Sequence, residues 1–400
     1  MSYARAAAFL FCFAGCSFST SPTPGGTPGN PSDAPGSPST GGNPGDGNGG
    51  TTPRPTATTI RIHYPAGSHT LALRGDGAGL DWNAGKPLVA GADDTYTFSV
   101  DALAAPLEFK PLLDDATWSR GPNYTVAPGA TVDVYPHFTT VAGSVVKLIP
   151  TFHSTVLGND RAIWAYLPPS YAENTRARFP VLYMHDGQNL FDPTLAFGGN
   201  EWKVDETLDA AAEDGSIEEL IVIGVENTAE RIYEYTPTTD PSTAGGGGGD
   251  KYLAMLKTEL KPAIDAMLRT LPDRAHTGIL GSSLGGLISA YAGVTQPDVW
   301  GIVGAMSPST WWNNEVIIGD VGGMPASARP ARVYVDSGDA GDSNDDVTNT
   351  NMLAATYVNL GYTSGVDFLH VVQAGGQHNE VYWAERLPGA LQFLFGKRTP

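Results

Sequence analysis

The sequence predicts an α/β fold, in which helices cover both faces of a mostly parallel β-sheet, with a smaller all-β domain before it. From about residue 145 onward, short apolar runs alternate with helical patterns, as in sheets whose parallel strands are joined by helices. Residues 59–140 instead hold short β-rich runs separated by turn signals. One stretch, HTGILGSSLGGLISAYAG (residues 276–293), places serines between glycines where a predicted strand meets a predicted helix.

Composition and charge exclude several classes of partner. The 400 residues carry a formal net charge of −19, whereas nucleic-acid binding needs clustered Lys and Arg. The same charge argues against electrostatic attachment to anionic lipid. The two cysteines, Cys12 and Cys16, lie near the N-terminus, so a disulfide framework or a cysteine metal site in the folded part is not expected.

The first residues predict export. Residues 1–16 contain one Arg and a short apolar run that ends in FAGC, and they resemble the signal of bacterial lipoproteins, in which the cysteine is lipidated. We therefore expect an extracytoplasmic protein anchored at Cys16, either periplasmic or on the cell surface; ordinary secretion is the alternative. Residues 17–58 are dominated by Gly, Pro, Ser and Thr, a composition typical of a flexible linker.

Residues 59–140 predict a β-sandwich. Their β-rich runs are TIRIHY, HTLALRG, DTYTFSV, LEFKPLL and TVDVYPHF, at the spacing of short strands in a sandwich. Residues 71–85 and 109–126 resemble starch- and glycogen-binding modules, whose fold is Ig-like. The resemblance implies that Trp82 and Trp118 stack on sugar rings; packing in a core or against another domain is the alternative for both.

Residues 145–400 carry the α/β pattern. Strands are expected in RAIWAYLP, PVLYMHDG, ELIVIGVEN, RAHTGILGS, GIVGAMSPS, ARVYVDSGD and DFLHVVQAGG. Residues 250–271 predict a helix because their apolar side chains recur at helical spacing. Pro262 is discordant within it.

Ser283 is the candidate nucleophile. It is the central residue of G-x-S-x-G, between a predicted strand and a predicted helix, which is the context of a nucleophile elbow. Glycines fit there because the turn leaves no room for Cβ atoms beside the serine. Ser282 is interpreted as a structural hydroxyl.

A nucleophilic serine needs a base and an acid, which follow it in the chain order Ser, acid, His. His378 is the candidate base because it follows a predicted strand in the glycine-containing loop QAGGQHNEVYW. Four candidate acids lie in one loop: Asp339, Asp342, Asp345 and Asp346. Asp345 is favoured because it lies just before the next helix, with Asp346 and Asp342 close behind. The alternation of Asp342, Asn344 and Asp346 lacks the glycine and closing Glu of a calcium loop, so no metal is expected.

The oxyanion of an acyl-transfer intermediate needs two backbone N–H donors. We expect one from Leu284, directly after the nucleophile, and one from Gln188, in the loop after VLYMHDG. This chemistry requires neither a metal nor an organic cofactor.

Six ordered motifs, VLYMHDGQNLFD, EWKVDETLD, VIGVENTAERIYEYTP, ILGSSLGGL, MSPSTWW and GGQHNEVYW, resemble the esterase D-type esterases of the α/β-hydrolase superfamily. That group includes feruloyl, acetylxylan and siderophore esterases. The resemblance implies the Ser283–His378 pair with an acid from the Asp-rich loop. It also implies substrate-pocket roles for Glu226, Arg231, Trp311 and Trp312.

These observations together predict a serine-dependent carboxylic ester hydrolase acting on an acylated carbohydrate, such as feruloylated or acetylated polysaccharide. A siderophore esterase and a sugar acyltransferase are alternatives with the same machinery. A non-catalytic, glycan-binding surface lipoprotein is the alternative from another class.

Overall fold

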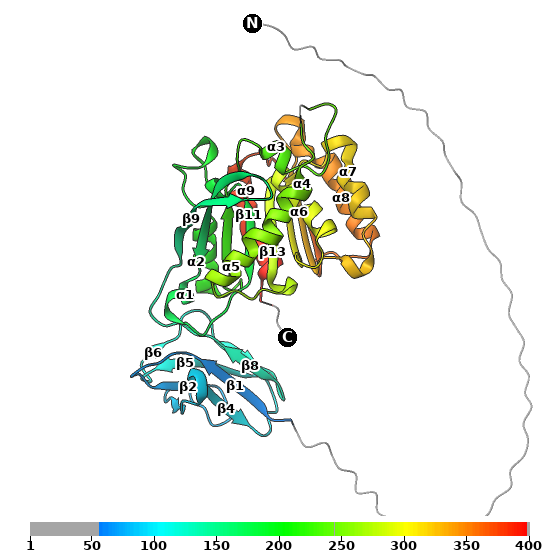
Figure 1. The fold of residues 1–400 in the computed structure, drawn as a ribbon. Coiled ribbons are helices and arrows are strands. Elements are labelled where there is room, and N and C mark those ends of the chain that lie inside the picture. Colours follow the sequence, from blue (N-terminus) through cyan, green and yellow to red (C-terminus); the bar gives the residue numbers. More distant parts are fainter. Residues whose placement is uncertain (1–55, 244, 398–400) are drawn as a thin grey trace, which may run out of the picture. The chain divides into compact units, whose positions relative to one another are not determined.

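The computed structural model describes residues 56–243 and 245–397, so the predicted signal with Cys16 and residues 17–55 of the linker lie outside the described residues. The N-terminal part consists of two small sheets (Figure 1). One has the strand order β4-β1-β8 and the other β3-β2-β5-β6, with β7 paired to β5. The strands are β1 (Thr58–His63), β2 (Leu71–Gly75), β3 (Lys86–Pro87), β4 (Thr95–Val100), β5 (Leu107–Leu113), β6 (Thr117–Trp118), β7 (Tyr124–Val126) and β8 (Thr131–Val134).

The two small sheets share a hydrophobic core of their own. Ile60 and Ile62 of β1 are fully buried beside Leu71, Leu73 and Phe109 of the other sheet. Along β1 these side chains alternate with less buried ones, which is the pattern of a sheet with one face packed on a core, whereas in β2 the intervening Ala72 is buried as well. Strands lie at all five positions that the sequence indicates, and β1 begins one residue before the predicted boundary. The Ig-like class of this part stays a prediction.

The C-terminal part is built on an eight-stranded sheet with the order β16-β15-β14-β13-β11-β12-β10-β9. From β12 to β16 neighbouring strands run parallel, whereas β10 pairs antiparallel with both β12 and β9. The sheet is therefore mixed, not uniformly parallel. Its strands are β9 (Ser144–Ser154), β10 (Asn159–Leu167), β11 (Val181–His185), β12 (Ile221–Val225), β13 (Thr277–Ser283), β14 (Ile302–Pro308), β15 (Arg332–Gly338) and β16 (Phe368–Gln373).

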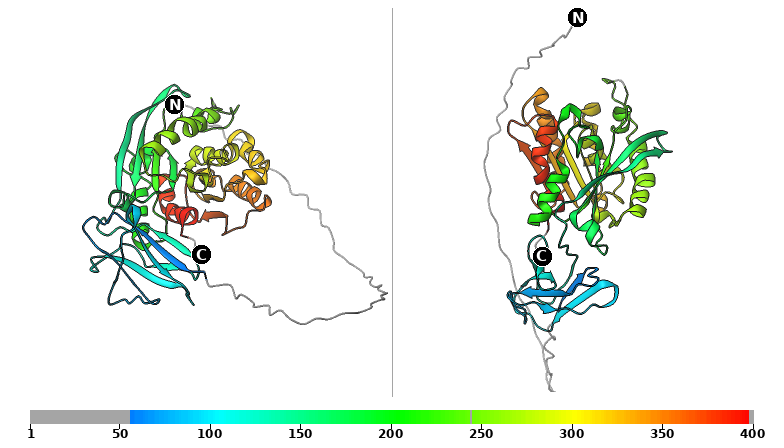
Figure 2. Two further views of the ribbon diagram at one scale, coloured as in Figure 1. Left: turned by 60° about the horizontal axis from the view of Figure 1, so that its bottom comes forward. Right: turned by 90° about the vertical axis from the view of Figure 1, so that its left-hand side faces the viewer.

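Helices cover both faces of this sheet (Figure 2). One face packs against α4 to α8, and the other against α2 and α9. The helices are α1 (Pro169–Glu173), α2 (Val204–Asp214), α3 (Arg231–Glu234), α4 (Gly249–Met255), α5 (Lys261–Met267), α6 (Leu284–Thr295), α7 (Trp312–Gly322), α8 (Val347–Asn359) and α9 (Glu380–Phe395). No helix in the described part of the chain is long and apolar enough to cross a membrane.

The helix predicted over residues 250–271 is divided into three segments. A π-helical turn, η4 (Leu256–Leu260), joins α4 to α5. Pro262 lies in the first turn of α5, where proline's missing N–H costs little. The π-helical turn before Pro262 thus allows the chain to keep a nearly continuous helical path through the proline.

The parallel strands bring the predicted site residues to one edge of the sheet. β13 lies between β14 and β11, so the loops after these three strands are neighbours. In open α/β sheets ligands bind at this carboxyl edge.

We predict that Gly281→Ala destabilises the fold. A Cβ at residue 281 would lie 2.7 Å from Cδ2 of His185 and 2.8 Å from the backbone carbon of Gly285. Such overpacking lowers the free energy of unfolding by about 1–3 kcal/mol. Urea denaturation measures it. The matched control is Gly319→Ala, since a Cβ there meets nothing within 4 Å in α7, and alanine is the better helix former. Equal stability of Gly281→Ala and wild type would contradict the packing described.

Candidate active site

Ser283 occupies a sharp turn between β13 and α6. Its backbone has φ 58° and ψ −125°, a strained conformation for a residue other than glycine. The turn is closely packed: a Cβ on Gly286 would lie 2.9 Å from the carbonyl oxygen of Met306. A Cβ on Gly285, the second glycine of the motif, would lie 3.3 Å from Cβ of His185, so the closest packing is at Gly281 and at Gly286, the residue that follows the motif.

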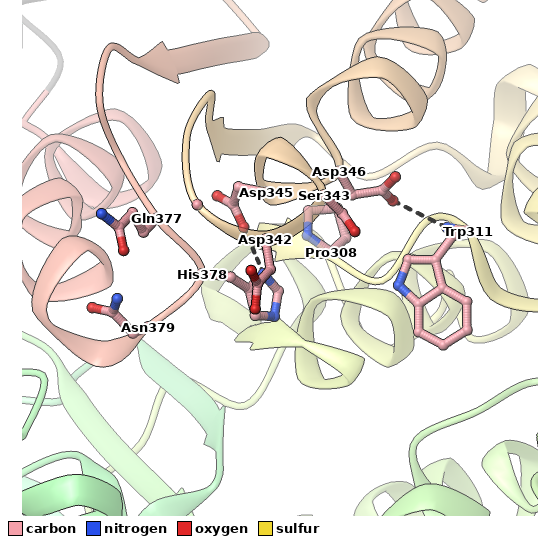
Figure 3. A pocket seen from close by; sticks show the side chains of 10 residues that line it. Pro308, Trp311, Asp342, Ser343, Asp345, Asp346, Gln377, His378 and Asn379 are labelled. Carbon is pink, nitrogen blue, oxygen red and sulfur yellow. Dashed lines mark hydrogen bonds and ion pairs between the residues drawn. The ribbon is translucent and has the colours of Figure 1, made fainter. Parts of the chain in front are cut away.

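His378 and Asp345 form a direct pair. Nδ1 of His378 lies 2.5 Å from Oδ1 of Asp345 (Figure 3). The Asp345 side chain is fully buried, while the imidazole is partly exposed. Because Nδ1 bonds the carboxylate, Nε2 is left for a second partner. The pair comes from two loops, one leading into α8 and one into α9.

The other carboxylates of the Asp-rich loop have different surroundings. Asp346, the second candidate acid, accepts hydrogen bonds from the backbone N–H of Trp311 (3.1 Å) and from Asn349 (2.9 Å). Asp339 accepts one from the N–H of Gly375 (2.6 Å), and Asp342 is exposed. Of the four candidates, Asp345 alone bonds His378.

Three donors hold Asp345 ionised. Burial by itself raises the pKa of this carboxyl, but hydrogen bonds from His378, Ser307 and the N–H of Gly338 outweigh burial and lower the pKa overall. The Ser307 hydroxyl lies 2.6 Å from Oδ2 of Asp345. The oxygen that does not face the imidazole is therefore also fixed in position.

Ser307 is the centre of a buried polar network behind the pair. Its hydroxyl is 3.0 Å from Nε1 of Trp383 and 2.7 Å from Nη2 of Arg386. Nε of Arg386 lies 2.9 Å from Oδ2 of Asp336, so this buried cation has a carboxylate partner. The Trp383 ring also packs edge-on against the imidazole, with ring centroids 5.1 Å apart. Sequence reasoning assigned these groups no role, although Ser307 lies in the motif MSPSTWW and Trp383 in GGQHNEVYW, because their partners are distant in the chain.

The larger cavity at the sheet edge, of about 640 Å³, is lined by His378, Trp311, Asp342, Gln377 and Asn379 among others (Figure 3). Pro308 also lines it and pairs in register with Ser283, so the nucleophile candidate lies beside the cavity. The Ser283 hydroxyl bonds Oγ of Ser309 at 3.3 Å instead of the imidazole. Catalytic hydrogen bonds are often long or misaligned without substrate, so this geometry is compatible with a base–nucleophile pair.

Both candidate oxyanion donors lie at this edge. Leu284 begins α6, and the first N–H groups of a helix have no intrahelical partner. Gln188 lies in η2 (Gly187–Asn189), directly after β11. A Cβ on Gly187 would lie 2.5 Å from the backbone carbon of Gly224, so this loop packs closely on the end of β12.

The two predicted pocket tryptophans differ. Trp311 is 43% exposed and lines the larger cavity. Trp312 is only 2% exposed, packs in the hydrophobic core and donates its indole N–H to the carbonyl of Thr238 (2.8 Å). The pocket role predicted for Trp312 is therefore wrong: adjacent residues at the start of α7 face in different directions, and this one faces the core.

Arg231 and Glu226 have partners within the protein. Nε and Nη2 of Arg231 each lie 2.8 Å from the carboxylate of Asp186, a bidentate pair. Glu226 accepts a hydrogen bond from the indole of Trp164 (2.7 Å). Arg231 thus has most of its charge compensated by Asp186.

His185, the last residue of β11, is buried. Its Nδ1 lies 2.8 Å from the Tyr252 hydroxyl, and burial lowers its pKa to about 3. It is therefore neutral at physiological pH and packs beneath the elbow.

Three carboxylates form the group best placed to hold a metal among the described residues: Glu201, Asp205 and Glu206, each with an oxygen within 4.8 Å of the others. They lie at the start of α2 and before it, apart from the His378–Asp345 pair. The prediction that no metal takes part stays a prediction.

Ser307→Ala tests the network behind Asp345. We expect kcat for ester hydrolysis to fall about tenfold or more with little change in KM, because the acid loses a fixed hydrogen bond while the cavity is untouched. Steady-state kinetics on an aryl acetate measure both constants. Ser289→Ala is the control, since that buried hydroxyl bonds only the carbonyl of Gly285 within its own helix. A rise in KM at constant kcat would contradict the positioning role.

Comparison with known proteins identifies the family. A family model described as "Putative esterase" matches residues 154–394. The uncharacterized protein YbbA of Bacillus subtilis is 28% identical over 249 residues, which are 60% of this chain and 94% of that protein. The siderophore triacetylfusarinine C esterase of Aspergillus fumigatus is 29% identical over 149 residues, covering 36% of this chain and 48% of that one. A solved ferulic acid esterase superposes with a TM-score of 0.51 at 24% identity, over 64% of this chain and 98% of that chain. The chain belongs to this esterase family, and it is a carboxylic ester hydrolase.

Proposed function

We propose that the protein hydrolyses esters through a Ser283–His378–Asp345 triad. The observation that carries the proposal is the 2.5 Å contact between His378 and Asp345 at the sheet edge where the strained elbow presents Ser283. Asp346 is left out because its hydrogen bonds go to Trp311 and Asn349.

The reaction has two steps. Nε2 of His378 takes the Ser283 proton while the serine oxygen attacks the ester carbonyl carbon, and the backbone N–H groups of Leu284 and Gln188 stabilise the oxyanion. The imidazolium then protonates the leaving alcohol. In the second step the imidazole deprotonates water, which attacks the acyl-enzyme carbonyl carbon; the bond to the serine oxygen then breaks, the imidazolium returns the proton to that oxygen, and the acid is released.

The charge of the larger cavity supports an uncharged alcohol, such as a sugar, as the leaving group. Asp342 and Asp346 line it together with the amides of Gln377 and Asn379. The described residues that line it include no Lys or Arg. Polar side chains beside an exposed ring, Trp311, suit sugar hydroxyls and the apolar face of a sugar.

A siderophore esterase is the second candidate, because the siderophore triacetylfusarinine C esterase of Aspergillus fumigatus is 29% identical to this chain over 149 residues. The carboxylates of the larger cavity would repel an anionic siderophore complex, which argues against this candidate. A sugar acyltransferase would share the triad and differ in the acceptor that replaces water.

The N-terminal sheets support attachment to polysaccharide. Trp82 and Trp118 lie outside their hydrophobic core, with ring centroids 6.2 Å apart. Arg74 contacts both tryptophans. Its Cζ lies 5.2 Å from the centre of the Trp118 ring, and its Nη1 donates a hydrogen bond to the carbonyl oxygen of Trp82 (3.2 Å). Paired aromatic faces at a surface suit the faces of neighbouring pyranose rings.

For location we propose a lipid anchor at Cys16, which with residues 17–55 would hold the enzyme outside the cytoplasm. The support is the FAGC motif in the sequence.

Ser283→Ala tests the triad. We expect hydrolysis of aryl acetate, methyl ferulate and acetylated xylan to fall by about 10⁴-fold or more, and labelling by a fluorophosphonate probe to disappear. Ser282→Ala is the matched control. Circular dichroism should match wild type for both variants. Retained activity in Ser283→Ala would refute the assignment, and preferential cleavage of a ferric catecholate siderophore would favour the second candidate.

Trp118→Ala tests the sugar-binding surface. Loss of one ring should weaken binding to insoluble polysaccharide by about fivefold or more, since aromatic contacts contribute about 1 kcal/mol each. Pull-down isotherms measure the affinity. Val89→Ala, which removes an exposed apolar side chain from the same part of the chain, should bind like wild type. Unchanged binding by Trp118→Ala would show that the rings do not hold sugar.

A further inference from the structure

A buried ion pair connects the ends of β11 and β12 next to the nucleophile turn. Asp186 directly follows β11, and Arg231 begins α3, which follows β12. Nε and Nη2 of Arg231 each lie 2.8 Å from a carboxylate oxygen of Asp186. A Cβ on Gly285, at the start of α6, would lie 3.6 Å from Oδ2 of the same carboxylate. The pair therefore lies against the helix that begins directly after Ser283.

Asp186 sets the course of the loop that carries Gln188. Its backbone has φ 55° and ψ 48°, in the left-handed region that residues other than glycine seldom adopt. Its N–H donates to the Tyr235 hydroxyl (3.3 Å), and its carbonyl oxygen accepts the N–H of Asn189 (2.8 Å). The direction of the N–H groups that follow therefore depends on how this one residue is held.

Asn227, in the segment between β12 and α3, adds two further bonds to this loop. Its side-chain amide donates to Oδ1 of Asp186 (2.6 Å), and its backbone N–H donates to the side-chain oxygen of Gln188 (3.3 Å). The segment after β12 thus holds the loop after β11 both at the Asp186 carboxylate and at the Gln188 side chain.

We propose that Asp186 is a positioning residue for ester hydrolysis, whose ion pair with Arg231 holds the backbone N–H of Gln188 where the oxyanion forms. This inference rests on the proposed function, in which Gln188 supplies one of the two oxyanion donors. Asp186 acts through the loop and does not touch the substrate. Arg231 then serves the same loop, instead of holding a substrate group.

The charges around the pair agree with this role. Burial by itself raises the pKa of Asp186, but the hydrogen bonds and charge of Arg231, together with Asn227, outweigh burial and lower the pKa overall. The carboxylate is therefore ionised at a pH where an imidazole acts as a base. Burial raises the pKa of Glu380, two residues after His378, and the charges of Asp186, His378 and Arg231 act on that same carboxyl. The pair thus lies within electrostatic range of the loop that carries the base.

Asp186→Asn, which keeps the size of the side chain and removes its charge, tests the inference with two substrates. Para-nitrophenyl acetate and para-nitrophenyl thionoacetate differ only in the atom that becomes negatively charged, and sulfur accepts hydrogen bonds more weakly than oxygen. The oxoester-to-thionoester ratio of kcat/KM should fall about tenfold or more, with little change in KM, since complete loss of an oxyanion donor costs about 10²–10³-fold in kcat.

Asp265→Asn is the matched control. Asp265 accepts hydrogen bonds from Lys261 (2.7 Å) and Thr270 (2.8 Å), so this variant also removes the carboxylate of an ion pair, but one whose hydrogen bonds do not involve the loops after β11 and β12. It should keep the wild-type ratio. A merely structural role of Asp186 would lower both rates together and leave the ratio unchanged.

Arg231→Ala gives a second measurement of the same pair. The Arg231 side chain is 28% exposed, so free guanidinium can reach the space that the substitution leaves. Guanidinium, well below denaturing concentrations, should pair with Asp186 and raise the ratio back toward the wild-type value. Sodium at the same ionic strength should not. This titration decides the question if Asp186→Asn does not fold, as read by circular dichroism.

Two outcomes would overturn the inference: a wild-type ratio in folded Asp186→Asn, or a ratio in Arg231→Ala that guanidinium does not change. Both are read while hydrolysis still depends on Ser283. Hydrolysis of the oxoester by Ser283→Ala at the wild-type rate would instead refute the proposed function itself.

Discussion

The packing of the turn at Ser283 is the constraint on which the site depends. A serine keeps a backbone φ of 58° only where the packing around it fixes the backbone in that conformation. Close contacts of glycines on both sides of the serine provide this packing. Gly281 lies against His185 and Gly285, and Gly286 lies against Met306 and Pro308. His185 can serve in that packing because burial keeps its ring neutral. The turn thus places Ser283 directly before α6 and beside Pro308, which lines the larger cavity.

A second constraint is the buried polar network that fixes Asp345 beside the imidazole of His378. The buried Asp345 carboxylate is compensated by hydrogen bonds from His378, Ser307 and the N–H of Gly338. Ser307 in turn contacts Trp383 and Arg386. A buried charge is costly unless it is paired and hydrogen-bonded, so this network is what allows an ionised acid at a fully buried position. The network thus fixes Asp345 against His378, whose imidazole remains partly exposed on the wall of the larger cavity.

The sequence by itself determined the local features of this protein. The strand–turn–helix at Ser283, the placement of Gln188 after β11 and the positions of most strands in the three sheets follow from short-range periodicity and from glycines that a tight turn requires. Tertiary structure decided which polar groups pair and which side chains are buried, because the partners lie far apart in the chain. Asp345 bonds His378 and the adjacent Asp346 does not; Trp311 is exposed and Trp312 buried. Ser307 and Arg386 meet across 79 positions of sequence, and the exposed, weakly alternating β9 is defined by its pairing with β10. Periodicity reports which side of an element is apolar, whereas the partner of a polar group depends on which strands and loops the fold brings together.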